Sequence, residues 1–207
     1  MIDNKKLLDV LNNIGDRIIE NKMVLNDLDT AIGDGDHGIN MSRGFTNVKD
    51  KLKDLEGKDC TTILNTVAMT LISTVGGASG PLYGTAFMKS AAAVKGMESI
   101  DSKAFLSILK ASIDGIQMRG KAVKGEKTIL DSLIPAYEAY EKSLSDEESG
   151  TKALEQAVIA ARDGVEYTKT IKATKGRASY LGDRSIGHAD PGATSTKLIL
   201  EAILEVL

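Results

Sequence analysis

The residues of this sequence with the clearest capacity for chemistry are three aspartates within eight positions. Asp29, Asp34 and Asp36 lie in the segment LDTAIGDGDHGIN (28–40), where glycines separate the acidic residues. Carboxylate oxygens this close together are the hard donors that Mg²⁺ or Ca²⁺ requires, and glycines free the backbone to bring them together. A solvated acidic turn is the alternative, because Asp and Gly are also common in ordinary turns. The pattern favours a divalent-metal site.

Two known motifs overlap this segment, and neither fits. A calcium-binding EF-hand loop starting at Asp34 needs glycine at its sixth place and glutamate at its twelfth, where this sequence has Ile39 and Phe45. The segment also reads Gly-x-Gly-x-x-Gly, but that dinucleotide fingerprint follows a strand and leaves its backbone amides bare. Here a carboxylate at about 4 Å would repel each phosphate oxygen by roughly 4 kcal/mol at an effective dielectric near 20. Anion binding at this segment therefore requires metal ions in between.

Two further glycine-rich segments have the composition of binding loops. The first, 76–84, contains Ser79 and leads into a helix, so it is either an anion site at the electropositive helix N-terminus or an ordinary serine cap. The second, 120–128, resembles a Walker A loop but has Glu126 where the lysine should follow the second glycine, and no strand precedes it. We interpret it as a flexible wall of a pocket, with a solvated basic turn as the alternative.

The segment 176–194 is long for a connection in a compact domain, and such loops are usually binding loops or lids. Arg177 and Arg184 could neutralise phosphate oxygens there, with surface salt bridges as the alternative. The pair Asp190-Pro191 is typical of the start of a helix. Both histidines of the chain lie in these loops, and neither has the partners of a hydrolytic triad.

The elements that must position these loops are helices. Apolar residues recur at three and four positions, as in Leu7, Leu11, Ile14 and Ile18, and no alternating strand pattern occurs. The expected fold is all-α, a single domain over 1–207, with helices at 3–25, 38–55, 60–75, 81–96, 101–119, 128–144, 150–172 and 191–206. The four polar segments are then the odd-to-even connections, which an up-and-down bundle gathers at one end. Caps are expected at Asp59 or Cys60 and at Asp101, and Pro135 should kink its helix or mark a later start.

The composition excludes several classes of protein. A net charge of -3 argues against a general nucleic-acid surface, which needs clustered Lys and Arg. No stretch approaches the roughly 20 apolar residues that span a membrane. The acidic, amphipathic N-terminal stretch is unlike a signal peptide, and the single cysteine, Cys60, has no internal partner, so a reducing cytoplasm is expected.

At its four polar loops the sequence closely resembles the ADP-binding L subunits of dihydroxyacetone kinases that draw phosphate from the phosphotransferase system. The matching stretches are IGDGDHGINMSRGF, GGASGPLYGT, RGKAVKGEKT and KGRASYLGDRSIGHADPGATS, spread over nearly the whole chain. The related nucleotide domain of fatty-acid kinases shares the acidic loop but continues differently and is fused to further domains. The chain is expected to end where an L subunit ends.

This resemblance implies a barrel of eight antiparallel helices with ADP at one rim and two Mg²⁺ ions held by Asp29, Asp34 and Asp36. It also implies a set of nucleotide contacts, with His37, Gly38, Ile39, Asn40, Ala78 and Ser79 at the phosphates and Gly120, Ile129, Asp190, Pro191 and Gly192 around the nucleoside. By the same likeness, Arg177 covers the phosphates and is the catalytic residue.

The implied activity is a phosphoryl relay. A phosphohistidine on a partner subunit converts bound ADP to ATP, and the γ-phosphoryl then passes to dihydroxyacetone held on a second partner subunit; a homodimer is left open. Phosphoryl transfer depends on positioning and charge neutralisation more than on protein nucleophiles, which agrees with the residues present. The alternatives are a free-standing ATP-dependent kinase and a regulator whose nucleotide state is sensed by a transcription factor.

Overall fold

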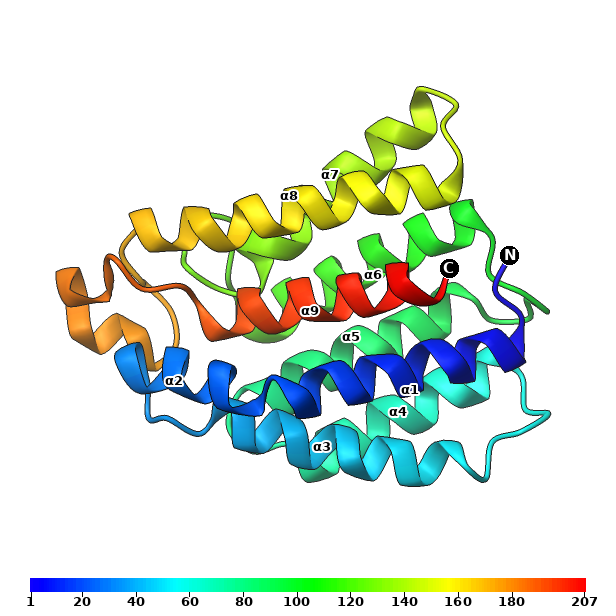
Figure 1. Ribbon diagram of the computed structural model, residues 1–207, viewed down its shortest axis with the longest axis horizontal. Helices are drawn as coiled ribbons and strands as arrows, with labels where there is room; N and C mark the ends of the chain where they lie inside the picture. The colour runs from blue at the N-terminus through cyan, green and yellow to red at the C-terminus, as the bar shows by residue number, and fades with distance from the viewer.

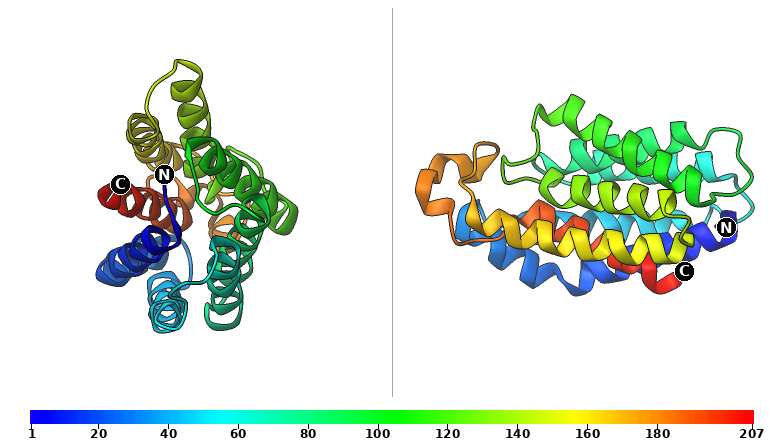
Figure 2. Two further views of the ribbon diagram at one scale, coloured as in Figure 1. Left: turned by 90° about the vertical axis from the view of Figure 1, so that its right-hand side faces the viewer. Right: turned by 90° about the horizontal axis from the view of Figure 1, so that it is seen from above.

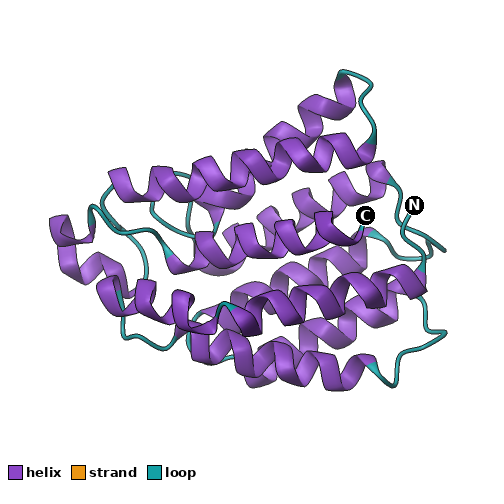
Figure 3. Ribbon diagram, viewed as in Figure 1, coloured by secondary structure: helices purple, strands orange, loops and turns teal.

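The all-α prediction is confirmed. A computed structural model of the protein, which describes residues 1–207, contains helices and no strand, apart from one isolated bridge between Ile2 and Ile100 (Figures 1 and 3). The helices are α1 (Asn4–Glu20), α2 (Lys22–Ile32), α3 (His37–Leu52), α4 (Cys60–Thr74), α5 (Ser79–Ala93), α6 (Ser102–Gly120), α7 (Leu130–Ser145), α8 (Gly150–Thr170), the 3₁₀ segment η1 (Arg177–Ser185) and α9 (Pro191–Val206).

The long helices form a closed ring. From α3 to α9 each α-helix packs against the next, and α1 closes the ring by packing against both α3 and α9 (Figure 2). The short connections make neighbouring helices antiparallel. One continuous cluster of 43 buried apolar residues fills the ring, so the inside of the barrel is a packed core.

The expected count of eight helices was wrong in one respect. The helix predicted at 3–25 is two helices, because the chain leaves helical geometry at Asn21 and continues as α2 to Ile32. The Asn21 side chain donates to the carbonyl of Arg17, an interaction by which asparagine competes with the helical backbone. Counted together, α1 and α2 take the place of the first predicted helix, and η1 is an additional turn inside the last predicted loop.

The two ends of the barrel differ in how the helices begin. At the end away from the polar loops, α1, α4, α6 and α8 each start with a side-chain cap, from Asp3, Asp59, Asp101 and Ser149. At the polar end, only α9 has such a cap, whereas the N-cap side chains of α3, α5 and α7 make no capping hydrogen bond. Three helix N-termini at this end thus keep amide donors that their own N-cap side chains do not satisfy.

Pro191 lies at the start of α9, and Pro135 lies in the interior of α7. Pro191 occupies the first turn of α9, where its missing N–H costs nothing. Pro135 lies inside α7, which begins at Leu130, two residues after the predicted start at 128. Pro135 therefore does not mark the start of this helix, and the second of the two expectations for it was wrong.

Candidate functional site

All four polar loops meet at one cavity of about 440 Å³. The expected gathering of these loops at one end of the bundle is therefore confirmed. Its walls are formed by the acidic turn, the start of α5, the α6–α7 loop, the start of η1 and the turn before α9. Of the residues singled out in the sequence, Asp29, Asp34, Asp36, His37, Ala78, Ser79, Gly120, Ile129, Arg177, Asp190, Pro191 and Gly192 line it.

The acidic turn is shorter than the predicted loop, because α2 extends to Ile32 and α3 begins at His37. Asp29 consequently lies on the last turn of α2 and not in a loop. Its carboxylate Oδ2 accepts hydrogen bonds from the backbone N–H groups of Asp36, at 2.8 Å, and of His37, at 3.1 Å. A side chain from α2 therefore caps α3 and fixes the turn between them.

The three carboxylates fit a divalent cation. One oxygen from each of Asp29, Asp34 and Asp36 lies within 4.8 Å of the others. At Gly33 an added Cβ would lie 2.1 Å from Asp29 Oδ1, so the turn leaves room for that oxygen only because residue 33 is glycine. Gly35 has a φ of +74°, a conformation that other residues adopt at a cost. The turn is shaped to bring hard oxygen ligands together, as Mg²⁺ requires.

The start of α5 faces the acidic turn across the cavity. Ala78 is the N-cap residue and makes no side-chain capping bond. Ser79, which the sequence offered as the cap, is the first residue of the helix, and its hydroxyl instead contacts the ring of His37 at 3.1 Å. Unsatisfied amides at this N-terminus carry partial positive charge and favour a bound anion.

His37 belongs to a buried hydrogen-bond network that joins three helices. Its Nδ1 lies 3.1 Å from Ser79 Oγ and its Nε2 lies 3.0 Å from Ser195 Oγ on α9. Ser195 Oγ in turn lies 2.6 Å from the hydroxyl of Tyr83 on α5. Burial lowers the pKa of His37, although Asp29 and Asp36 oppose the shift. The neutral ring therefore ties α3 to α5 and α9, and both of its nitrogens are engaged.

Arg177 sits over the acidic turn at the start of η1. Its Nε lies 2.9 Å from Asp34 Oδ2, and its side chain is 68% exposed. Below it, Ala178 packs with Ile32 of α2 in a small apolar cluster. An exposed arginine over a carboxylate cluster is free to turn towards a phosphate, with which it makes strong bidentate hydrogen bonds.

Part of the cavity wall is apolar. Leu82 from α5, Ile116 from α6 and Ile129 at the start of α7 line it, together with the backbone of Gly120 and of the turn 190–192. Such a wall suits the flat apolar faces of a nucleoside. Asp190 also lines the cavity, and its carboxylate accepts the N–H of Ala193 at 2.7 Å and so caps α9.

Burial raises the pKa of Asp190 to about 7, and the nearby Asp131 adds to the shift, whereas the Ala193 N–H and Lys127 oppose it. The folded state therefore retains a proton that the unfolded chain releases near pH 4, so in nucleotide-free protein this group's contribution to stability is lost as the pH rises towards 7. We expect Asp190→Asn to remove that loss. The difference in free energy of unfolding between about pH 5 and about pH 8, measured by urea titration, should shrink by on the order of a few kcal/mol. The matched change Asp183→Asn, at an exposed carboxylate of η1, should leave it unchanged.

Some residues singled out in the sequence lie away from the cavity. Gly38, Ile39 and Asn40 form the first turn of α3 but do not line it, and an added Cβ at Gly38 would lie 2.0 Å from the carbonyl of Lys22. Their role as nucleotide contacts stays a prediction. Arg184 does not line the cavity either.

The sequence reasoning missed several residues that the fold brings to the site. They are Tyr83 and Ser195 of the histidine network, the cations Arg119 and Lys175, and the buried Lys127. The spacing within a single helix or loop gives no signal for them, because the fold brings them together from separate elements. Only Lys127 could have been singled out from the sequence, because it lies within the glycine-rich segment 120–128 that resembles a Walker A loop.

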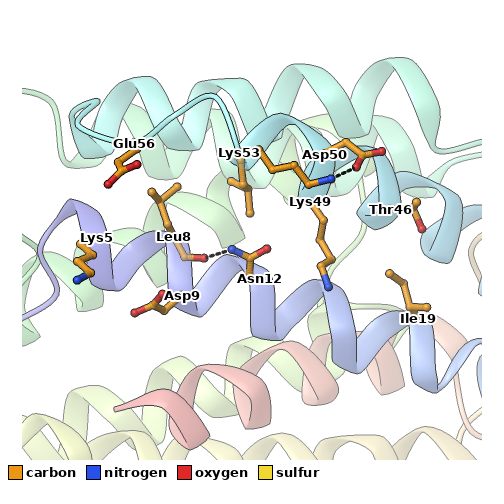
Figure 4. Close-up of a pocket in the computed structure, with 11 residues that line it drawn as sticks. Lys5, Leu8, Asp9, Asn12, Ile19, Thr46, Lys49, Asp50, Lys53 and Glu56 are labelled. Atoms are coloured by element: carbon orange, nitrogen blue, oxygen red, sulfur yellow. Dashed lines mark hydrogen bonds and ion pairs between the residues drawn. The ribbon is translucent and has the colours of Figure 1, made fainter.

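A second hollow, of about 570 Å³, lies along the outside of the barrel between α1 and α3 (Figure 4). Several of its charged side chains are already paired: Lys53 pairs with Asp50 at 2.8 Å, and Lys49 pairs with Asp16. It has no cluster of metal ligands, and the start of α1, where Lys5 lies, is capped by Asp3. The candidate site of the chain is therefore the cavity at the polar end of the barrel.

No helix has the length and apolarity needed to cross a membrane.

Comparison with known proteins gives one consistent result. The family model described as the DAK2 domain matches residues 31–205. The chain is 47% identical over 196 residues to "PEP-dependent dihydroxyacetone kinase 1, ADP-binding subunit DhaL" of Listeria innocua, covering 94% of this chain and 92% of the relative. It is 41% identical over 202 residues to the subunit of Escherichia coli called "PEP-dependent dihydroxyacetone kinase, ADP-binding subunit DhaL", covering 98% and 96%.

Solved structures show the same fold. The dihydroxyacetone kinase of C. freundii matches with a TM-score of 0.76 at 21% identity in its native form. Its complex with AMP-PNP and Mg²⁺ matches with a TM-score of 0.74 at 22% identity. In both cases the match covers 98% of this chain and 34% of the larger kinase chain.

Proposed function

This chain belongs to the DAK2-domain family, and on that premise we propose that it is the ADP-binding subunit of a phosphoenolpyruvate-dependent dihydroxyacetone kinase. The observation that carries the proposal is the convergence of three carboxylates and an uncapped helix N-terminus on one cavity. Carboxylates alone repel a diphosphate, and a helix N-terminus alone does not select one. Together they suit a nucleoside diphosphate whose charge is shared between metal ions and backbone amides.

Different residues of the cavity would bind the metal ions and the phosphates of the ligand. Asp29, Asp34 and Asp36 would hold two Mg²⁺ ions, which would neutralise the charge of the phosphate oxygens. The start of α5 at Ala78 and Ser79 would donate amides to the phosphates, and we assign the first turn of α3, from His37 through Gly38 and Ile39 to Asn40, to the same side.

The nucleoside would lie against the apolar part of the cavity wall. Gly120, Ile129 and the turn Asp190-Pro191-Gly192 would enclose it there. Arg177 would fold over the phosphates from η1 and act as the catalytic residue. The whole chain, 1–207, would serve as one nucleotide-binding domain.

The proposed role is a relay in the cytoplasm. The nucleotide stays bound, takes a phosphoryl group from a phosphohistidine-carrying partner subunit and yields it to dihydroxyacetone on another partner subunit. This chain supplies positioning and charge neutralisation, which account for most of the catalysis of phosphoryl transfer. Its one cavity histidine has both ring nitrogens occupied by hydroxyls, so it is poorly placed to act as a nucleophile.

Native mass spectrometry tests this proposal directly. Gently purified protein should carry the added mass of ADP with two magnesium ions, and exhaustive chelation should release both. Phosphoryl groups should reach dihydroxyacetone only after reconstitution with both partner subunits. Rapid turnover of ATP and dihydroxyacetone by the isolated chain would instead identify a free-standing kinase. Retention of nucleotide without any transfer on reconstitution would favour a regulator sensed by a transcription factor.

A further inference from the structure

The most unusual buried group outside the acidic turn is the ammonium of Lys127. The residue is 1% exposed. Its Nζ donates to three backbone carbonyls, those of Thr168 at 2.5 Å, His188 at 2.6 Å and Ile171 at 3.3 Å. Lysine is almost never fully buried without partners. This ammonium has three, and all of them are main-chain groups.

The carbonyl partners explain how the charge is tolerated. Thr168 and Ile171 are at the C-terminal end of α8, where unpaired carbonyls carry the negative end of the helix dipole. The carboxylates of Asp131 and Asp190 also favour the charged form, although burial lowers the pKa of Lys127. The ammonium therefore acts as a C-terminal cap for α8, supplied by a loop that is distant in sequence.

The same residue ties together two walls of the cavity. On its own side, Asp131 accepts the N–H groups of Gly125, at 2.5 Å, and Thr128, at 2.7 Å, which folds the loop around Lys127. Thr128 and Ile129, next in the chain, line the cavity. Lys127 itself has a φ of +61°, which a non-glycine residue keeps only when its surroundings enforce it.

The other wall is the turn that precedes α9. The carbonyl of His188 accepts from Lys127, and two residues later the N–H of Asp190 donates to Thr168 Oγ1 at 2.9 Å. These two hydrogen bonds hold the turn 190–192 against the end of α8. A single buried ammonium therefore connects the loop that leads to Ile129 with the turn 190–192, whose Gly192 lies beside Ile129.

We propose that Lys127 is a positioning residue for the nucleotide, which fixes the spacing between the Thr128–Ile129 wall and the 190–192 turn by joining both to the end of α8. This inference rests on the proposed function, since it names what holds the nucleoside half of that site. Direct contact with a phosphate is a poor alternative, because the three N–H groups of the ammonium are already spent on carbonyls.

The test is Lys127→Met, which keeps the length of the side chain and removes the charge and the donors. We expect a fluorescent ADP analogue to dissociate at least about tenfold faster, as the loss of charge-assisted hydrogen bonds implies. In nucleotide-free protein, hydrogen–deuterium exchange should show lost protection in residues 125–130 and 187–193, with α3 and α4 unchanged. The control is Ile63→Ala, which truncates a buried core side chain near the start of α4, at the end of the barrel away from the cavity. It should lower the melting temperature without changing the dissociation rate.

Each outcome decides between the possibilities. A dissociation rate equal to that of the unaltered protein, or of Ile63→Ala, would overturn the inference. Lost binding with unchanged exchange protection would also overturn it, because it would place Lys127 on the ligand itself. If Lys127→Met does not fold, Lys127→Gln, which keeps two N–H donors without the charge, takes its place with the same criteria. Failure of the unaltered protein to bind the analogue would count against the proposed function and not against this residue.

Discussion

Asp34→Ala is expected to lower the affinity for ADP in the presence of Mg²⁺ by about a thousandfold. Asp34 is a better choice for removal than Asp29, because its carboxylate accepts no backbone hydrogen bond, whereas that of Asp29 caps α3. At about 4 Å and an effective dielectric near 20, one charge pair contributes roughly 4 kcal/mol, which corresponds to about three orders of magnitude in affinity. Isothermal titration with ADP and Mg²⁺ measures the loss.

The fold should survive this substitution. The only ion pair that Asp34 makes is the exposed contact with Arg177, and exposed pairs contribute little to stability. Far-ultraviolet circular dichroism and the melting temperature of nucleotide-free protein should therefore match those of the unaltered chain. Asp183→Ala, at a carboxylate of η1 that pairs with Lys172, is the matched control and should leave ADP affinity unchanged. Tight Mg²⁺-dependent ADP binding by the Asp34 variant would remove the acidic turn from the proposed site.

Arg177→Ala is expected to slow phosphoryl transfer by about a thousandfold while the protein keeps its nucleotide. An arginine that stabilises the charge of a transferring phosphoryl group is typically worth at least about three orders of magnitude in rate. The ground-state diphosphate is held mainly by the metal ions, so ADP affinity should fall by no more than about tenfold. The measurement is a single turnover: protein loaded with ATP is mixed with the dihydroxyacetone-binding subunit, and dihydroxyacetone phosphate is followed in time.

Two further variants separate charge from geometry. Arg177→Lys keeps the charge but loses the planar fork that grips a phosphate at two points, so its rate should fall between those of the unaltered protein and the alanine variant. Arg184→Ala removes an arginine from the same short segment that does not line the cavity, and it should transfer at the normal rate. A rate loss in Arg184→Ala as large as in Arg177→Ala would mean that η1 acts through partner docking and not through the phosphates.

Local sequence determined much of this protein. The three- and four-residue apolar period requires helices, because only a helix places those residues on one face. Asp59, Asp101 and Pro191 mark helix starts at which the structure does begin helices, since a cap acts on amides two or three residues away. The acidic turn was also visible, because its carboxylates and glycines are neighbours in the chain.

Tertiary structure decided what the chain pattern does not encode. The break at Asn21 and the extension of α2 moved Asp29 onto a helix, from which it caps α3. His37 meets Ser195 across 158 positions, and Lys127 reaches the end of α8 across 41. Contacts of this kind leave no period or spacing in the sequence, because they depend on how closed packing brings distant helix ends together. The sequence by itself thus determined the helices and the chemistry of the acidic turn, whereas the closing of the barrel decided which buried polar groups hold that chemistry in place.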